Sequence, residues 1–164
     1  MEEFYENSND NGEDTLKGRY LTFIIDKESF GIEIRFVMEI IGIQTITEMP
    51  EMPDFMKGII NLRGKIIPVM DIRIRFRKNP RQYDDRTCVI VIDFKGTLVG
   101  FIVDSVSEVL TIPEADITDR PSLSAGDSRG YINKIGKVLN TVILLLDCGK
   151  LLNKEEFVTI SSLA

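Results

Sequence analysis

The sequence predicts a mainly β protein built from two similar halves, with short helices between some of the strands. Short runs rich in Val, Ile and Phe alternate with breaks that contain Gly or charged residues, which is the pattern of strands and hairpin turns. Two pairs of tracts also match one another along the chain. Because both pairs occur in the same order at nearly the same offset, they indicate an internal duplication.

The matched tracts define the two halves. They are residues 30–41 with 99–110, and residues 58–66 with 130–138. In this alignment glycines meet glycines in both pairs, whereas Arg63 meets Ile135. A duplication alone therefore does not account for Arg63.

Arg63 and Gly64 form a short polar break between two apolar, β-prone runs. Because Gly tolerates the positive φ of tight turns, we expect a strand that ends near Leu62, a turn, and a strand that returns from Lys65. Pro68 cannot donate to a ladder, so the return strand should lie at an edge or start a new pairing there. A guanidinium at the tip can stay solvated or bind a partner's carboxylate, and spacing alone leaves both open.

The first half begins with a polar segment and continues with strands. Residues 1–14 are rich in Glu, Asn, Asp and Gly, which predicts a disordered acidic tail. Aromatic and β-branched residues predict a strand from Arg19 to Asp26 and, after a turn at 27–29, another from Phe30. Near Ile34 helical spacing overlaps with β-prone residues, so we expect a short helical turn that leads into a strand.

Two later segments of the first half have alternative interpretations. Residues 48–57 contain two prolines and predict a loop, whose Met49, Met52 and Met56 either close the end of a barrel, which we prefer, or pack against a partner. Arginines alternate with apolar residues over 71–78, which predicts a strand with a basic, solvated face. The resulting patch would contain Arg73, Arg75, Arg77, Lys78 and Arg81. An acidic partner or RNA is the alternative use of this patch.

The second half is expected to repeat the same order. Its predicted elements are a polar linker at 79–86, a strand buried on both faces at 87–94, a turn at Lys95-Gly96, and strands at 98–104 and 105–110. A long loop at 113–130, a hairpin from Tyr131 to Asp147 and a short helix at 153–162 complete the prediction.

The composition is that of an acidic globular protein. The chain has 164 residues, a formal net charge of −6 and a sequence pI near 4.8, which disfavours general nucleic-acid binding. The acidic N-terminus has no signal-peptide pattern, and no apolar run approaches about 18 residues. We therefore expect a cytoplasmic protein that does not insert into a membrane.

Recognisable catalytic motifs are absent. The chain has no His, the commonest general base and metal ligand, and no cofactor-binding motif. Cys88 and Cys148 form no CxxC pair, so no zinc site or disulfide framework is predicted, and Cys88 is expected to be buried. An enzyme that uses only Asp, Lys or Arg remains an alternative, although the acidic residues Glu39, Asp71, Asp93, Asp104 and Glu108 are scattered.

Four stretches together resemble the CheW-like family of chemotaxis coupling proteins. They lie at residues 30–34, 37–40, 58–68 and 99–104, and the string Asn-Leu-Arg-Gly in a hairpin followed by Pro68 is specific for this family. The resemblance covers about residues 15–155. It implies two five-stranded SH3-like β-barrels around a shared core, with subdomain 1 at about 15–83 plus a C-terminal segment and subdomain 2 at about 84–150.

The resemblance also implies a function. It implies a non-catalytic adaptor, without cofactor or metal, that couples the cytoplasmic tips of chemoreceptors (methyl-accepting chemotaxis proteins) to the regulatory domain of the histidine kinase CheA. A groove between the barrels would accept the apolar face of a helical receptor tip. The residues that match the family's partner-binding positions and motif are Arg63, Val37, Glu39, Gly58, Asn61 and Val109.

Overall fold

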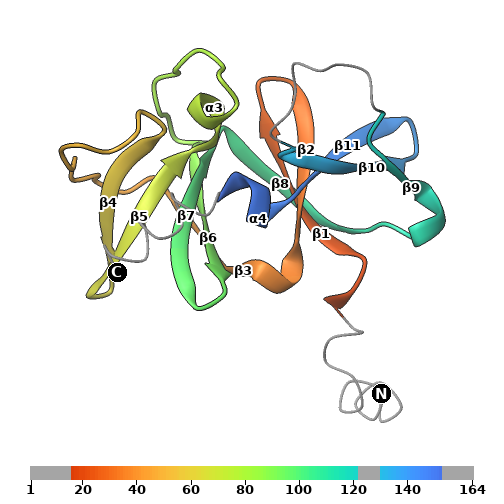
Figure 1. Cartoon of the computed structure of the whole chain (residues 1–164), viewed down its shortest axis with the longest axis horizontal. Helices are drawn as coiled ribbons and strands as arrows, with labels where there is room; N and C mark the ends of the chain where they lie inside the picture. The colour runs from red at the N-terminus through yellow and green to blue at the C-terminus, as the bar shows by residue number, and fades with distance from the viewer. Residues whose placement is uncertain (1–15, 122–129, 153–164) are drawn as a thin grey trace, which may run out of the picture.

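The computed structural model describes residues 16–121 and 130–152, and Figure 1 shows two twisted sheets side by side. The expected tail at 1–14 and the expected helix at 153–162 lie outside the described residues. The elements in the first half are β1 (Arg19–Ile25), β2 (Glu28–Glu33), η1 (Ile34–Phe36), β3 (Val37–Gly42), β4 (Met56–Leu62), β5 (Lys65–Asp71) and α3 (Ile72–Arg75). Those in the second half are β6 (Cys88–Phe94), β7 (Thr97–Val103), β8 (Ser105–Thr111), η2 (Glu114–Asp116), β9 (Ile117–Asp119), β10 (Ile132–Val138), β11 (Thr141–Leu146) and α4 (Cys148–Leu151).

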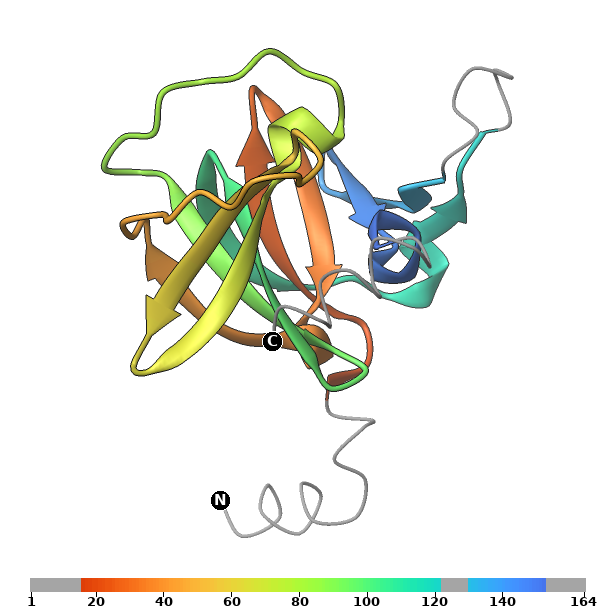
Figure 2. The ribbon, with the colours of Figure 1, turned by 60° about the vertical axis from the view of Figure 1, so that its left-hand side comes forward.

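Each sheet combines strands from both halves. One sheet has six strands in the order β8-β1-β2-β11-β10-β9, and the other has five in the order β3-β6-β7-β5-β4. Two parallel pairings, β5 with β7 and β11 with β2, join the halves. Figure 2 shows the five-stranded sheet curling around its own interior. The sheets therefore do not follow the expected division between residues 83 and 84.

The core has three parts. The largest cluster of buried side chains takes residues from both sheets, including Phe23 and Phe30, whose rings stack 5.7 Å apart, and Phe101. A second cluster fills the five-stranded sheet around Ile60, and a third fills the six-stranded sheet. This matches two sheet interiors that share a common core.

The order of elements confirms the two similar halves but corrects the alignment of their hairpins. Ile135 and the Gly that follows it lie inside β10, whereas the turn falls at Leu139-Asn140. Leu139 therefore takes the place of Arg63, and both residues have a positive φ, 55° and 51° respectively. The alignment was misled because Gly and apolar residues occur within strands as well as at turns, so a Gly inside β10 was matched to the turn Gly of the first hairpin.

Several local predictions are confirmed. The helical turn near Ile34 is η1, which leads directly into β3, and the middle of β6 is buried. Pro68 does not lie in an edge strand: the parallel pairing of β5 with β7 begins at the next residue, Val69. The loop methionines differ in burial: Met56 begins β4 and is buried, whereas Met49 is exposed.

The basic strand predicted at 71–78 is wrong. Asp71 ends β5, and its carboxylate accepts hydrogen bonds from the backbone N–H groups of Arg73 and Ile74, so the chain turns into α3. This is an N-cap, which stabilises the first turn of a helix. Asp147 caps α4 in the same way, through the N–H of Lys150. The long loop predicted from residue 113 contains η2 and β9 in its described part.

Candidate functional site

Arg63 lies at the tip of the β4–β5 hairpin, as predicted. Arg63 and Gly64 both have positive φ, 51° and 87°, which is the twist that favours a two-residue hairpin turn. The side-chain Oδ1 of Asn61 accepts a hydrogen bond of 2.9 Å from the N–H of Gly64. Asn61 therefore shapes the turn that presents Arg63.

The guanidinium of Arg63 forms an ion pair with Glu39. Glu39 belongs to β3, and Arg63 directly follows β4, so the pair joins the two edge strands of the five-stranded sheet. The hydrogen bond and the charge of Glu39 raise the pKa of Arg63. Because 70% of the Arg63 side chain stays accessible to solvent, the guanidinium is held in place and still open to a partner.

Gly58 secures the base of the same hairpin. The chain that follows β3 returns to β4 through two backbone hydrogen bonds of 2.9 Å between Thr47 and Ile59. A Cβ added to Gly58 would lie 2.1 Å from the carbonyl oxygen of Thr47, and its φ is 143°. Only Gly permits this close approach. Together with the Glu39–Arg63 pair, it closes the five-stranded sheet on itself.

The two valines occupy different sheets. Val37 is the half-buried first residue of β3, pairs with Ile92 and packs against the largest core cluster. Val109 is 42% exposed on β8, opposite Leu21, in the six-stranded sheet. The structure thus groups Arg63, Glu39, Asn61 and Gly58 around one hairpin, whereas Val109 stands apart from them in the sheet order.

Three exposed apolar side chains near the hairpin were missed by the sequence reasoning. Met38 and Ile40 are 56% and 43% exposed on β3, and Ile66 is 44% exposed on β5, just after the turn. The alternation of half-buried and exposed residues along β3 was the signal that could have revealed the first two. Met38 and Ile40 are the neighbours of Glu39 along β3, and because side chains alternate between the two faces of a strand, they point to the opposite face from Glu39.

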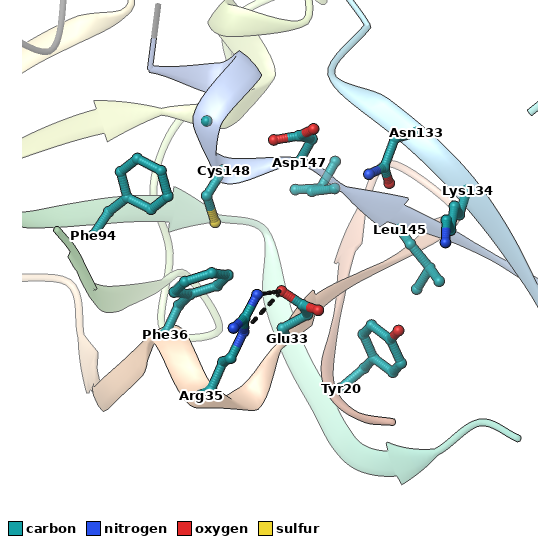
Figure 3. A pocket seen from close by; sticks show the side chains of 12 residues that line it. Tyr20, Glu33, Arg35, Phe36, Phe94, Asn133, Lys134, Leu145, Asp147 and Cys148 are labelled. Carbon is teal, nitrogen blue, oxygen red and sulfur yellow. Dashed lines mark hydrogen bonds and ion pairs between the residues drawn. The ribbon is translucent and has the colours of Figure 1, made fainter. Parts of the chain in front are cut away.

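A groove of about 360 Å³ lies where the two sheets meet (Figure 3). Its walls come from β1, β2, η1, the end of β6, β10, β11 and α4. The lining residues are Tyr20, Glu33, Arg35, Phe36, Phe94, Asn133, Lys134, Leu145, Leu146, Asp147, Cys148 and Gly149. The groove is thus walled by aromatic rings and by charges of both signs.

The structure breaks up the predicted basic patch, because two of its five residues are buried and two others face carboxylates, which leaves Arg77 exposed on the surface. Arg73 is buried and donates to Asp104 at 2.8 Å, to Asp26 and to a backbone carbonyl. Arg75 is also buried, donates to the carbonyl of Leu151 and lies over the rings of Phe55 and Tyr131, 4.2 Å and 4.8 Å from their centroids. Lys78 and Arg81 face carboxylates. The observation that favoured a nucleic-acid interface is therefore removed.

Four of the five scattered acidic residues, Glu39, Asp71, Asp93 and Asp104, have structural partners. Asp71 accepts a hydrogen bond of 2.7 Å from the hydroxyl of Tyr83, and Asp93 accepts one of 3.0 Å from Gly96 N–H. Burial first, and then nearby carboxylates, raise the pKa of Cys148 to about 12, which keeps its thiol protonated. Cys88, expected to be buried, is partly exposed. Within residues 16–121 and 130–152, no cluster of His, Cys, Asp and Glu could hold a metal ion.

None of the described helices is long and apolar enough to cross a membrane. With the fold and the hairpin established, comparison with known proteins places the chain in a family. Residues 19–156 match the profile described as "CheW-like domain". Since this match covers most of the chain, it decides the family.

Individual relatives agree with this assignment. The chain is 35% identical over 151 residues to the chemotaxis protein CheW of Klebsiella aerogenes, which covers 92% of this chain and 91% of that protein. It is 30% identical to CheW of Bacillus subtilis, with 84% and 88% covered. The crystal structure of the scaffolding protein TtCheW from Thermoanaerobacter tengcongensis superimposes with a TM-score of 0.77 at 33% identity, and covers 85% of this chain and 94% of that one. The chain therefore belongs to the CheW-like family and is a non-catalytic adaptor of chemotaxis.

Proposed function

We propose that this chain couples the cytoplasmic tips of chemoreceptors to the regulatory domain of the histidine kinase CheA, and that the β4–β5 hairpin is one of its partner-binding surfaces. The observation that carries the second part is the Arg63 guanidinium, which Glu39 holds while most of the side chain remains exposed. An arginine fixed in this way loses less conformational entropy on binding than a free one.

The surroundings of Arg63 support a binding role. Interface hot spots are enriched in Arg and are ringed by contacts that exclude water. Here Met38, Ile40 and Ile66 supply exposed apolar surface on β3 and β5. A partner that covered the hairpin tip would shield the guanidinium from solvent and strengthen its contact with a carboxylate.

The other partner-binding positions act in two ways. Gly58 and Asn61 hold the hairpin in shape, so their contribution to binding is indirect. Val109 offers an exposed apolar side chain in the six-stranded sheet, which suits contact with a second partner. We place the protein in the cytoplasm, where it joins membranes only through its receptors. Two weak contacts reinforce one another when both partners are held in one assembly.

The test is a pair of separate binding measurements, one with a receptor cytoplasmic fragment and one with the regulatory domain of the kinase. Wild type should bind both, and Arg63→Ala should weaken the receptor contact about thirtyfold or more while the protein stays folded. Lys95→Ala is the matched control, because Lys95-Gly96 is a hairpin tip with similar positive φ values, 53° and 84°, and the Asp93 side chain accepts from the N–H of Gly96 as Asn61 accepts from that of Gly64.

Three results would count against the proposal. Unchanged binding of Arg63→Ala to both partners would remove the hairpin from the interface. Equal losses in Arg63→Ala and Lys95→Ala would point to a general charge effect. Failure of the folded wild type to bind either partner would reject the coupling role for this chain.

A further inference from the structure

The charge of this chain is divided unevenly along the sequence. Residues 1–15, which we call the acidic segment, contain six acidic and no basic side chains, and so account for the whole net charge of −6. Since the chain has 26 acidic and 20 basic residues in all, the rest of it carries equal numbers of both. Within the acidic segment Phe4 and Tyr5 stand together, with Glu3 before them and Glu6 after them. A coupling role by itself does not explain such a segment.

The strand directions place several turns of the chain at one end of the molecule. β5 and β7 run parallel, so the β4–β5 and β6–β7 turns, which precede them, lie at the same end of the five-stranded sheet. β3 also starts there, because Val37 pairs with Ile92 near the end of β6, and η1 directly precedes β3. β1 contacts η1, and Figures 1 and 2 both show the start of β1 at this end. We call this region the turn end.

The turn end carries six exposed cations. They are Lys17, Arg19, Arg35, Arg63, Lys65 and Lys95. Arg35 pairs with Glu33, and Arg63 pairs with Glu39. The other four cations form no ion pair within the described part of the chain. Their charges are therefore available to a further acidic group.

Few other carboxylates oppose these cations. Asp93, in the β6–β7 hairpin, accepts a hydrogen bond from the N–H of Gly96. Glu114 lies near the start of β1, because Ile112, two residues before it, donates its N–H to the carbonyl of Gly18. With the two paired carboxylates, four acidic groups thus face six cations. The turn end is positive overall, opposite in sign to the acidic segment.

Exposed apolar surface lies at the turn end as well. Met38 is the second residue of β3 and is 56% exposed, and Ile66 is the second residue of β5 and is 44% exposed. Cations beside apolar side chains suit a ligand in which acidic residues flank aromatic ones. The stretch from Glu3 to Glu6 has this pattern.

The acidic segment also joins the rest of the chain at the turn end. Leu16, the first described residue, is separated from β1 by only two residues. Fifteen residues span about 50 Å when fully extended, which exceeds the diameter of about 35 Å expected for a domain of this size. The segment is therefore long enough to reach the β4–β5 turn. Because it belongs to the same chain, its effective concentration at that turn is high.

We propose that the acidic segment of this chain lies over the turn end and competes with the carboxylates of a partner for Arg63. Its acidic side chains would face the unpaired cations, while Phe4 and Tyr5 would cover exposed apolar side chains. A partner's carboxylate is drawn by the same positive charge, so the two exclude one another. The competition rests on the proposed function, whereas the contact between the acidic segment and the turn end does not.

The first test compares ¹⁵N NMR spectra of the full chain in wild type and in the segment variant Glu2→Gln/Glu3→Gln/Glu6→Gln. The backbone amide signals of Gly64 and Gly96, one in each turn, should differ between the two proteins. The difference should disappear in about 0.5 M NaCl, because salt screens exposed charges.

A control variant removes the same number of charges elsewhere. Glu48→Gln/Glu51→Gln/Asp54→Asn neutralises three exposed carboxylates that precede β4, at the end of that strand opposite to the β4–β5 turn. It should leave the signals of Gly64 and Gly96 in place. Unchanged signals in the segment variant, or equal shifts in the control variant, would overturn the proposal.

The second test measures the affinity for a receptor cytoplasmic fragment. The segment variant should bind about threefold more tightly than wild type at low salt, since Arg63 loses a competing acidic group. In an Arg63→Ala background the same substitutions should give no gain. Equal affinities of wild type and the segment variant would overturn the competition. A wild type that binds no fragment would instead reject the coupling role, and the NMR comparison would still decide the contact with the turn end.

Discussion

Arg63 and Arg73 lie a short way apart in the same half of the molecule, yet the structure uses them in opposite ways. The Arg63 side chain is 70% exposed and pairs with one carboxylate where the two edge strands of the five-stranded sheet meet. The Arg73 side chain is 10% exposed and pairs with two carboxylates between the sheets. Arg63 is thus presented to solvent, whereas Arg73 links α3 to the β1–β2 turn and to the end of β7.

The difference comes from the elements that carry them. A hairpin tip leaves its side chains in water, where an ion pair contributes little to stability. The first turn of α3, in contrast, directs Arg73 towards the β1–β2 turn at Asp26, the end of β7 at Asp104 and the carbonyl of Asn79. Residue type alone therefore does not reveal whether an arginine serves binding or folding. The four predictions below test this contrast, beginning with the largest effect on stability.

Replacing Arg73 with Leu should lower the free energy of unfolding by roughly 3 kcal/mol, because it leaves a buried carboxylate without its main partner. The side chain of Asp104 is only 8% exposed and keeps just the hydrogen bonds from Arg81 and from the backbone of Asp26. Urea unfolding of wild type and Arg73→Leu measures this loss. Arg63→Leu is the matched control, and equal losses in both variants would abolish the contrast.

Gly58→Ala should cost roughly 2 kcal/mol of unfolding free energy, since its Cβ would meet the Thr47 carbonyl and its φ is strained for other residues. Gly64→Ala, at the tip of the same hairpin, has no atom within 4 Å of the added Cβ and should cost about 1 kcal/mol from the positive φ alone. Chemical denaturation of both variants separates the base from the tip. A larger loss in Gly64→Ala would contradict our account of the base.

Acid should weaken the contacts of Arg73 specifically. The hydrogen bond from Arg73 holds the pKa of Asp26 below its usual range. Because the folded pKa is the lower one, this contribution is present above the unfolded value of about 4 and disappears as the pH falls below it. Urea midpoints of wild type should therefore drop as the pH falls below about 5. In Arg73→Leu the drop should be smaller, and an identical drop would show that other carboxylates cause it.

Arg63→Ala should have the smallest effect on stability, with no measurable change in the urea midpoint, because the guanidinium is exposed and its partner Glu39 can return to water. Lys95→Ala, at the corresponding tip of the β6–β7 hairpin, should behave alike. Thermal and urea unfolding of both variants provide the measurement. A clear loss of stability in Arg63→Ala alone would mean that the ion pair is needed to close the five-stranded sheet.

Local sequence patterns predicted most of the strands and the tip of the first hairpin correctly. The Arg63-Gly64 turn, the helical turn at η1 and the buried strand β6 all follow from residues within a few positions of one another. The hairpin of the second half was misaligned, since its turn at Leu139-Asn140 lacks the Gly that marks the first. Turn chemistry is local, so it can be predicted only where the typical turn residues are present.

For the candidate site, the family resemblance supplied the residues but not the contacts that each of them makes. Asn61 and Gly58 belong to the matched motif, yet only the coordinates reveal that one shapes the turn and the other accommodates Thr47. The exposed apolar side chains on β3 and β5 were not predicted, and the groove expected between the barrels had no residues assigned to it. Both depend on neighbours that come from distant parts of the chain.

The sequence by itself determined the mainly β class, the two similar halves and an arginine at a hairpin tip. Strand propensity and turn chemistry depend on neighbouring residues, and repetition can be found by comparing one tract of the sequence with another. The tertiary structure alone decided that each sheet combines both halves, through the parallel pairings of β5 with β7 and β11 with β2. It also decided that Asp71 ends a strand and directs Arg73 inward. The physical reason is that backbone pairing and charge burial depend on which distant segments meet, and no local pattern specifies that.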